Sequence, residues 1–327
     1  MRHATTLRGA TLLTLILTAA PACDNVIWGG ADIEIVPPPP AASMTPVPTD
    51  ERVFAEYGLP RGQVIFHIVP SDQGSRLIPI GEISGDSVRT IRRPAGVAPE
   101  AYEGRFRDAV IPIGAQFDVF RRGARVGTFV AQRPGPVTQC GVPTVLGNTT
   151  VVAAASDIDQ FISFRQGLAP AARGEFSPPQ ITGSIRTYAS IIAERLILQN
   201  GLPRPRSWTG AQRDMQAVEI AAGGHPEMAA TYLVGDSLAV GPADPQGYSV
   251  FYIADFETRR GYQPVYQEVH DYRQGGKAAP RLVDYLNWDG EGGEEILIEV
   301  FGTDQRWYEA ISERNGRWTK IWEGERC

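Results

Sequence analysis

The sequence predicts a mainly β protein in which two β domains are joined by a short helical connector. Three observations lead to this prediction. Short runs of β-branched and aromatic residues alternate with Gly, Pro and Asp, a pattern typical of strands and turns. The 327 residues include 35 Gly and 26 Pro, well above the average combined share of roughly 12%. One β unit is also present twice near the C-terminus, which indicates stacked supersecondary repeats.

Residues 1–22 are expected to be a bacterial export signal. Two arginines precede an apolar stretch over 11–20, which is too short to span a bilayer and ends in small residues. The following Ala20-Pro21-Ala22-Cys23 resembles the lipobox of bacterial lipoproteins. This resemblance implies a lipid on Cys23 and a membrane anchor. A soluble secreted protein is the alternative, because Ala-Pro-Ala also fits an ordinary cleavage site.

Residues 23–50 predict an extended tether. Four consecutive prolines occupy 37–40, and further prolines follow. Proline fixes φ and removes a hydrogen-bond donor, so such a segment stays extended. We therefore expect an exported protein of the cell envelope that faces the periplasm, with the membrane and an envelope protein as its partners.

The cysteines predict one disulfide. If Cys23 carries a lipid, Cys140 and Cys327 remain as an even pair in an oxidising compartment. Two unpaired thiols are the alternative. There is no pair of cysteines at the spacing of a metal or redox motif.

Residues 51–152 are expected to form an all-β domain, either a sandwich or a small barrel. Its clearest hairpin turn is Arg121-Arg122-Gly123, which lies between two well-alternating apolar runs. The strands are expected at residues 63–69, 76–80, 115–120, 124–130 and 149–153.

Residues 153–210 are expected to be the helical connector. Ser156 is a candidate cap for a short helix that runs to Arg165. Ser184 is a candidate cap for a longer helix that Asn200-Gly201 ends. In that helix, apolar residues recur at helical spacing, and we expect them to pack on a sheet. They are Ile185, Tyr188, Ile192 and Leu196.

Residues 211–327 are expected to form the duplicated β domain, with two four-stranded, blade-like units. Glu227 and Glu295 mark equivalent positions, since each follows a glycine-containing loop and opens a strand. A strand pair and a hairpin come after each glutamate.

The loop of the second unit suggests a metal site. The segment from Val283 to Leu297 resembles the D-x-N-x-D-G-x-x-D/E loop of FG-GAP/VCBS β-propeller repeats, although its spacing departs from that pattern. The resemblance implies calcium, which prefers several oxygen ligands from one turn. An acidic, solvated hairpin loop is the alternative. The candidate ligands are Asp284, Asn287, Asp289 and Glu294.

The last forty residues also carry an aromatic face. If Asn315-Gly316 makes a type I′ turn, Glu313 pairs with Trp318 and Glu309 pairs with Trp322. Such a face is core, a protein interface or a platform for sugars. Its members would be Trp307, Ile311, Trp318 and Trp322.

A catalytic alternative rests on Gly235-Asp236-Ser237-Leu238, which resembles the nucleophile block of GDSL-type hydrolases. The resemblance implies Ser237 as nucleophile. The blocks that supply the oxyanion donors and the base in that family do not follow in this sequence, and the surroundings favour a hairpin. The histidines after the signal, His67, His225 and His270, are expected to be ordinary strand or loop residues.

The sequence therefore favours a binding function over catalysis. A formal net charge of −6 excludes a basic nucleic-acid binder as the leading interpretation. We expect a non-enzymatic, lipid-anchored envelope protein that acts as a binding or scaffold module, for which an accessory subunit of a membrane complex is one role. No cofactor is expected except calcium under the alternative of a calcium- or glycan-binding β module. An envelope hydrolase is the remaining alternative.

Overall fold

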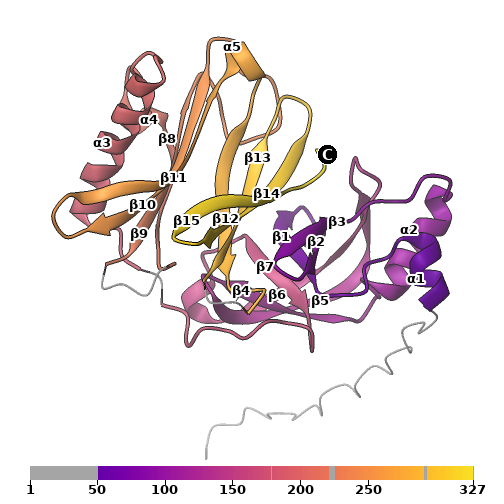
Figure 1. The fold of residues 1–327 in the computed structure, drawn as a ribbon. Helices are drawn as coiled ribbons and strands as arrows, with labels where there is room; N and C mark the ends of the chain where they lie inside the picture. Colours follow the sequence, from indigo (N-terminus) through magenta and orange to yellow (C-terminus); the bar gives the residue numbers. More distant parts are fainter. Residues whose placement is uncertain (1–50, 178, 221–224, 291–292, 327) are drawn as a thin grey trace, which may run out of the picture. The chain divides into compact units, whose positions relative to one another are not determined.

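The computed structural model describes residues 51–177, 179–220, 225–290 and 293–326 (Figure 1). The export signal, Cys23, the tether and Cys327 lie outside the described residues. The chain is mainly β, with one closed sheet and two four-stranded sheets, so the fold class expected from the sequence is confirmed. Among the described helices, none is long and apolar enough to cross a membrane.

The first sheet is a small barrel. Its strands follow the order β1-β7-β4-β5-β6-β2-β3, and an additional β1–β2 pairing closes six of them into a ring. The hairpin between β4 and β5 turns at Arg122 and Gly123, whose φ angles of 52° and 76° are those of a type I′ turn. The strands are β1 (Val64–Ser71), β2 (Gly74–Ser84), β3 (Ser87–Thr90), β4 (Gln116–Arg121), β5 (Ala124–Val137), β6 (Pro143–Val151) and β7 (Phe161–Arg165).

Aromatic side chains fill the barrel. Phe117 packs edge-on against Phe66 and Phe129, with ring centroids 5.0 and 6.0 Å apart, and all three are buried. Helix α2 (Pro99–Ala109) adds Tyr102 and other apolar residues to the same core. Helix α1 (Glu51–Tyr57) and a short 3-10 helix, η1 (Ala153–Ala155), complete this half of the chain.

One expectation for this region is wrong. The segment from Ser156 to Arg165 is not a helix, because Phe161–Arg165 is strand β7, which lies between β1 and β4. Its alternating side chains explain the difference, since Phe161 enters the barrel core while Ile162 and Phe164 point to the outside. The barrel therefore extends beyond residue 152.

The longer helix of the connector is confirmed as α3 (Gly183–Gln199), followed by α4 (Trp208–Ala211). Thr182, rather than Ser184, is its cap, because the Thr182 hydroxyl accepts a hydrogen bond from the amide of Ile185 at 3.3 Å. The helix ends at Asn200, and its apolar stripe packs on a sheet as expected.

Two further sheets repeat one meander. Their orders are β11-β10-β9-β8 and β12-β13-β14-β15. Glu227 accepts a hydrogen bond from the amide of Ile220 at 2.9 Å, and Glu295 accepts one from Trp288 at 3.0 Å, in each case seven residues back. The strands are β8 (Gln212–Val218), β9 (Glu227–Val234), β10 (Tyr248–Glu257), β11 (Gly261–Asp271), β12 (Ala279–Leu286), β13 (Glu295–Phe301), β14 (Arg306–Arg314) and β15 (Arg317–Glu323), with helix α5 (Tyr272–Gly275) before β12.

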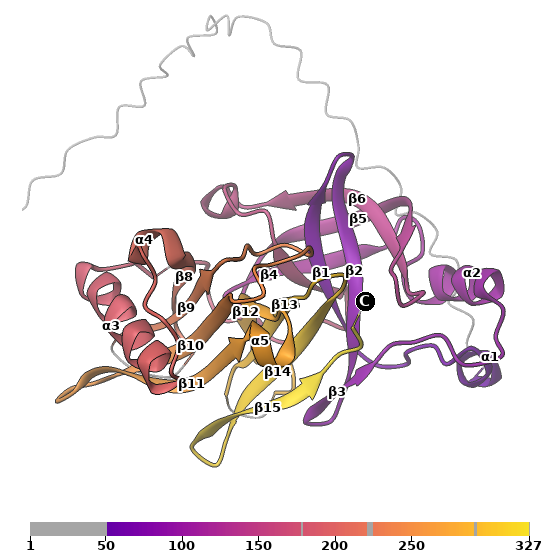
Figure 2. The ribbon, with the colours of Figure 1, turned by 90° about the horizontal axis from the view of Figure 1, so that it is seen from above.

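The sheets stack in layers (Figures 1 and 2). Helix α3 covers one face of the β8–β11 sheet. The other face of that sheet packs on the β12–β15 sheet, and the far face of the β12–β15 sheet packs on the outside of the barrel. Strands between two layers are buried on both faces, which explains the nearly continuous apolar runs of β10 and β13.

The expected aromatic face is divided between two of these layers. Glu313 pairs with Trp318 as expected, but a bulge in β15 makes Ala310 pair with Trp322, where the sequence predicted Glu309. One extra residue turns Trp322 to the barrel side. Trp307 and Ile311 are buried on the opposite side, with Trp318 partly buried against them. These residues are core between layers, which is the first of the three interpretations that the sequence allowed.

Candidate functional site

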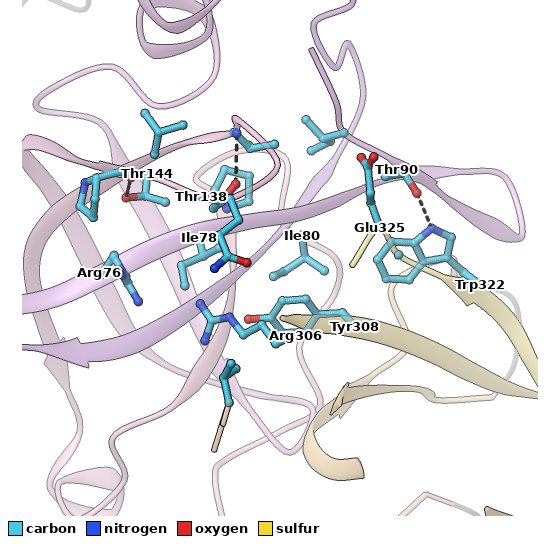
Figure 3. A pocket seen from close by; sticks show the side chains of 18 of the residues that line it. Arg76, Ile78, Ile80, Thr90, Thr138, Thr144, Arg306, Tyr308, Trp322 and Glu325 are labelled. Carbon is cyan, nitrogen blue, oxygen red and sulfur yellow. Dashed lines mark hydrogen bonds between the residues drawn. The ribbon is translucent and has the colours of Figure 1, made fainter. Parts of the chain in front are cut away.

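A cavity of about 330 Å³ lies where the β12–β15 sheet meets the barrel (Figure 3). Arg76 of β2 enters it from the barrel, while Arg306 and Tyr308 of β14 enter from the opposite sheet. Trp322 of β15 forms part of the wall and donates its indole N–H to the Thr90 hydroxyl at 3.2 Å. We call this the Arg76–Arg306 cavity.

The rest of the wall combines aliphatic side chains with hydroxyl groups and with the carboxylates of Asp304 and Glu325. Thr144 and Thr138 border the cavity, and both make hydrogen bonds within the β5–β6 hairpin. A ligand here would meet two guanidinium groups and an apolar surface at once. The apolar lining residues are Ile78, Pro79, Ile80, Ile91, Pro136, Val137, Val142 and Val240.

The two arginines concentrate positive charge at one end of the cavity. Figure 3 shows both side chains extending into the same region. Burial lowers the pKa of Arg76, and the charge of Arg306 lowers it further. The Nε atom of Arg76 is buried without a hydrogen-bond partner among the described residues. An anion placed beside the two guanidinium groups would relieve their repulsion.

A buried polar network lies behind the wall. His67 of β1 and Tyr308 share a hydrogen bond of 2.9 Å between Nδ1 and the hydroxyl oxygen. Glu299 of β13 forms an ion pair with Arg306 at 3.0 Å and a second one with Arg281. Although burial alone would raise the pKa of Glu299, His67 and the two arginines hold it below its usual value. The network therefore fixes Arg306 at the cavity.

This network favours neutral forms of the His67–Tyr308 pair near pH 7. Burial lowers the pKa of His67 to about 4. Burial also raises the pKa of Tyr308, and Glu299 raises it further. A general acid or base works best with a pKa near the operating pH, and neither group meets that condition. The pair is suited to positioning rather than to proton transfer.

The buried histidine leads to a prediction about acid stability. Unfolding should become easier as the pH falls from 6.5 towards 4, because unfolded His67 binds a proton that the folded protein excludes. The expected loss is about 3 kcal/mol across this window. Urea unfolding at pH 7, 5 and 4 measures it.

His67→Asn should flatten the dependence, whereas His225→Asn, at an exposed site against Phe256, should leave it unchanged. An unaltered slope in His67→Asn contradicts the assignment.

The four candidate calcium ligands have separate partners. Asp284 is buried beside Arg121 at 3.6 Å and accepts the Arg122 amide at 2.7 Å. Glu294 pairs with Arg173 at 3.2 Å, and Asp289 pairs with Arg314 at 3.3 Å. The remaining candidate, Asn287, accepts a hydrogen bond from the amide of Gly290 at 2.7 Å.

These contacts are structural. The partners of Asp284 are Arg121 at the end of β4 and Arg122 in the turn that follows. The partner of Glu294 is Arg173, which follows the last barrel strand. These contacts attach the β12–β15 sheet to the barrel. Within the described ranges, no three His, Cys, Asp or Glu side chains are grouped to hold a metal ion.

Ser237 lies in the exposed loop between β9 and β10, not at a strand-to-helix elbow. Its neighbour Asp236 forms a buried ion pair with Lys277 at 2.6 Å and accepts a hydrogen bond from Tyr272 at 2.5 Å. His270, the nearest base in the following sequence, bonds instead to Glu268 at 3.1 Å. The Gly-Asp-Ser-Leu block thus contributes a buried salt bridge to the fold.

Cys140 lies next to the C-terminal end of the described chain. Its sulfur is 3.5 Å from the carbonyl oxygen of Arg326. Cys327, its expected disulfide partner, lies outside the described residues, so the Cys140–Cys327 disulfide remains a prediction. The contact brings the residue before Cys327 to Cys140, which is the proximity that such a bond requires.

Of the cavity residues, the sequence analysis singled out Trp322 and missed both arginines and Tyr308. Arg76 immediately precedes the apolar run Leu77–Ile80, and Arg306 precedes two aromatic residues, which is the one available signal. That signal gives no partner, because His67 and Tyr308 are 241 positions apart in the chain. The expectation of an ordinary strand histidine fits His67, whose ring is buried in β1.

Comparison with known proteins adds no assignment. No family model matches the chain, no curated protein is detectably similar to it, and no solved structure is detectably similar to its fold.

Proposed function

We propose that the protein is a non-enzymatic binding module of the bacterial cell envelope that takes an anionic ligand into the Arg76–Arg306 cavity. The observation that carries the proposal is the pairing of two convergent guanidinium groups with an apolar wall. Guanidinium groups bind carboxylates, sulfonates and phosphates by charge-assisted hydrogen bonds. The apolar side of the cavity adds affinity for a ligand that is not purely ionic.

The setting in the envelope is the second part of the proposal. The lipobox-like sequence at Cys23 supports a lipid anchor, and the Pro-rich segment up to residue 50 supports a tether that holds the β layers away from the membrane. A protein in this position would present its cavity to ligands of the periplasm. It would also be placed to act as an accessory subunit of a membrane complex.

The chemistry of the cavity favours binding over catalysis. The hydroxyl of Tyr308 and the imidazole of His67 are the groups nearest to acid–base chemistry, and burial shifts the pKa of each away from neutrality. Ser237 lies in the loop after β9 and lines none of the cavity. The arginines, by contrast, are suited to holding a ligand in its charged form.

Binding of an amphipathic anion tests the proposal. Anilinonaphthalene sulfonate carries a sulfonate on an apolar ring system, and its fluorescence rises in apolar surroundings. We expect saturable binding to the full chain, and Arg76→Met should weaken it by about tenfold or more, since a charge-assisted hydrogen bond is lost. Fluorescence titration of both proteins gives the two dissociation constants.

The matched control is Arg186→Met, which removes an exposed arginine of α3 with the same change in net charge. It should bind the dye as the wild type does, and both variants should keep the wild-type melting temperature. Equal dissociation constants for wild type and Arg76→Met would reject the cavity as the binding site.

A further inference from the structure

The Arg76–Arg306 cavity is one end of a longer furrow. Three more depressions follow it, one beside the segment after β3, one under α1 and one at the end of the barrel near α2. Their volumes are about 720, 300 and 170 Å³ in that order. Each depression shares two lining residues with the next, so the four are neighbours in a row. The shared pairs are Thr90 and Glu325, then Gly58 and Arg89, then Phe54 and Arg61.

Arginine lines every part of the furrow. Arg89 and Arg306 form ion pairs with the buried carboxylates of Glu82 and Glu299. The other five arginines have no carboxylate oxygen within 4.0 Å among the residues that the structure describes. Together with Arg89 and Arg306, these five arginines outnumber the two acidic residues that line the depressions, Asp304 and Glu325, in a protein with a net charge of −6. The five are Arg61, Arg76, Arg92, Arg93 and Arg165.

Backbone carbonyl groups hold some of these side chains in place. The Arg61 guanidinium donates to the carbonyl oxygen of Glu51 at 3.0 Å, and the Arg165 guanidinium donates to that of Ala109 at 3.0 Å. A guanidinium group has five N–H donors, so most of its donors remain for a ligand. A carbonyl group orients the side chain without cancelling its charge, which lowers the entropic cost of binding an anion.

The recurrence of charge indicates a ligand in which anionic groups also recur. A small anion would occupy one depression and leave the other arginines unused. A linear polyanion can place successive anionic groups in successive depressions, and the contacts then act as linked binding sites. An excess of positive over negative charge along a cleft also accelerates the arrival of such a ligand.

We propose that the furrow binds a linear acidic glycan whose charges are uronate carboxylates. The proposal rests on the proposed function, since the Arg76–Arg306 cavity forms one end of the site. Carboxylates match the planar fork of arginine. Thr90, Thr138 and Gln139 line the furrow among the arginines, and their hydroxyl and amide groups complement the hydroxyls of sugar rings. An acidic peptide also carries carboxylates, but it lacks the ring hydroxyls of a glycan, so it would leave these threonine and glutamine groups without hydroxyl partners on the ligand.

Titration with galacturonate and its tetramer and octamer tests this inference in the full chain. We expect the octamer to bind about a hundredfold more tightly than the monomer, because linked contacts raise the effective concentration. Arg92→Ala/Arg93→Ala should weaken octamer binding by about tenfold or more and leave monomer binding unchanged. Arg76→Met should weaken both ligands. Isothermal titration at low and at physiological salt gives the constants, and octamer affinity should fall with salt.

Arg259→Ala/Arg260→Ala is the matched control, because it also removes two adjacent exposed arginines, at the β10–β11 turn. It should bind the octamer as the wild type does. Equal weakening in this control, or octamer binding no tighter than monomer binding, overturns the furrow while leaving the cavity function intact. Absence of any anion binding overturns both. Polyglutamate that binds as tightly as the octamer identifies an acidic peptide as the ligand and overturns the glycan assignment.

Discussion

Replacing Lys277 by Met is expected to lower the free energy of unfolding by about 3–5 kcal/mol. The Lys277 ammonium lies 2.6 Å from a carboxylate oxygen of Asp236, and the two side chains are 2% and 0% exposed. Removing the ammonium leaves the carboxylate buried without its counter-charge. The cost of an unpaired buried charge is much larger than the net benefit of the pair.

The surroundings of this ion pair increase the effect. Lys277 also donates to the carbonyl oxygens of Ser237 and Ala239, at 3.3 and 2.7 Å, so its loss removes one donor from each; the Ser237 carbonyl still accepts the Ala239 amide at 2.9 Å. Tyr272 still donates to Asp236, which compensates for only part of the loss. The loop that carries the Gly-Asp-Ser-Leu block would therefore be held more weakly, mainly by Tyr272 and by the Gly241–Gly302 backbone hydrogen bond at 3.3 Å.

Equilibrium urea unfolding measures the change. Arg260→Met serves as control, because the Arg260–Glu257 pair at 3.6 Å is 73% and 49% exposed and should contribute less than about 1 kcal/mol. The double variant Lys277→Met/Asp236→Leu should recover much of the lost stability, since it removes both charges. A loss in Lys277→Met no larger than that of the control would show that the pair is not buried as described.

The second large effect is expected in the barrel, where Phe117→Ala should lower the free energy of unfolding by about 3–5 kcal/mol. Phe117 is fully buried and contacts Phe66 and Phe129 edge-on. Truncation removes apolar contacts from both rings and leaves a cavity that the closed six-stranded sheet cannot easily collapse.

Unfolding monitored by far-ultraviolet circular dichroism measures this loss. Phe117→Leu should cost less, because more of the volume remains. Ile191→Ala is the control, since Ile191 is 52% exposed on α3 and Ala is a better helix former. A Phe117→Ala change as small as that of the control would contradict a barrel with Phe117 at its centre.

The local features of this fold were predicted from the sequence. Alternating residues predicted strands β1, β2, β4 and β5 approximately where they lie, while the strand expected at 149–153 covers only the end of β6. The Arg122-Gly123 hairpin was identified from its turn residues. The spacing of Glu227 and Glu295 revealed the repeat, because each glutamate holds the same backbone amide in its own unit. Signals of this kind act within a few residues of the chain, where propensity and periodicity apply.

Features that depend on distant partners were missed. Strand β7 was assigned to a helix because nothing local shows that β1 and β4 flank it. Trp322 was placed on the wrong face because a bulge leaves one residue unpaired and reverses the side-chain order beyond it.

The cavity depends most strongly on contacts between distant parts of the chain. It exists because two sheets meet, and its Thr90–Trp322 hydrogen bond joins residues 232 positions apart. The arginines of the furrow come from loops and strands throughout the barrel half, and Arg306 comes from the repeat. Their common direction is a property of the packed layers, so charge and composition alone did not reveal the site.

Hydrogen exchange measured with and without octagalacturonate tests the central claim that this protein binds anions at the Arg76–Arg306 cavity. We expect slower exchange of backbone amides in β2, in the 136–144 segment and at the start of β14, which together form the cavity wall. Protection should extend to residues 89–95 along the furrow. Protection confined to the β8–β11 sheet, or exchange unchanged at a saturating ligand concentration, would contradict the account.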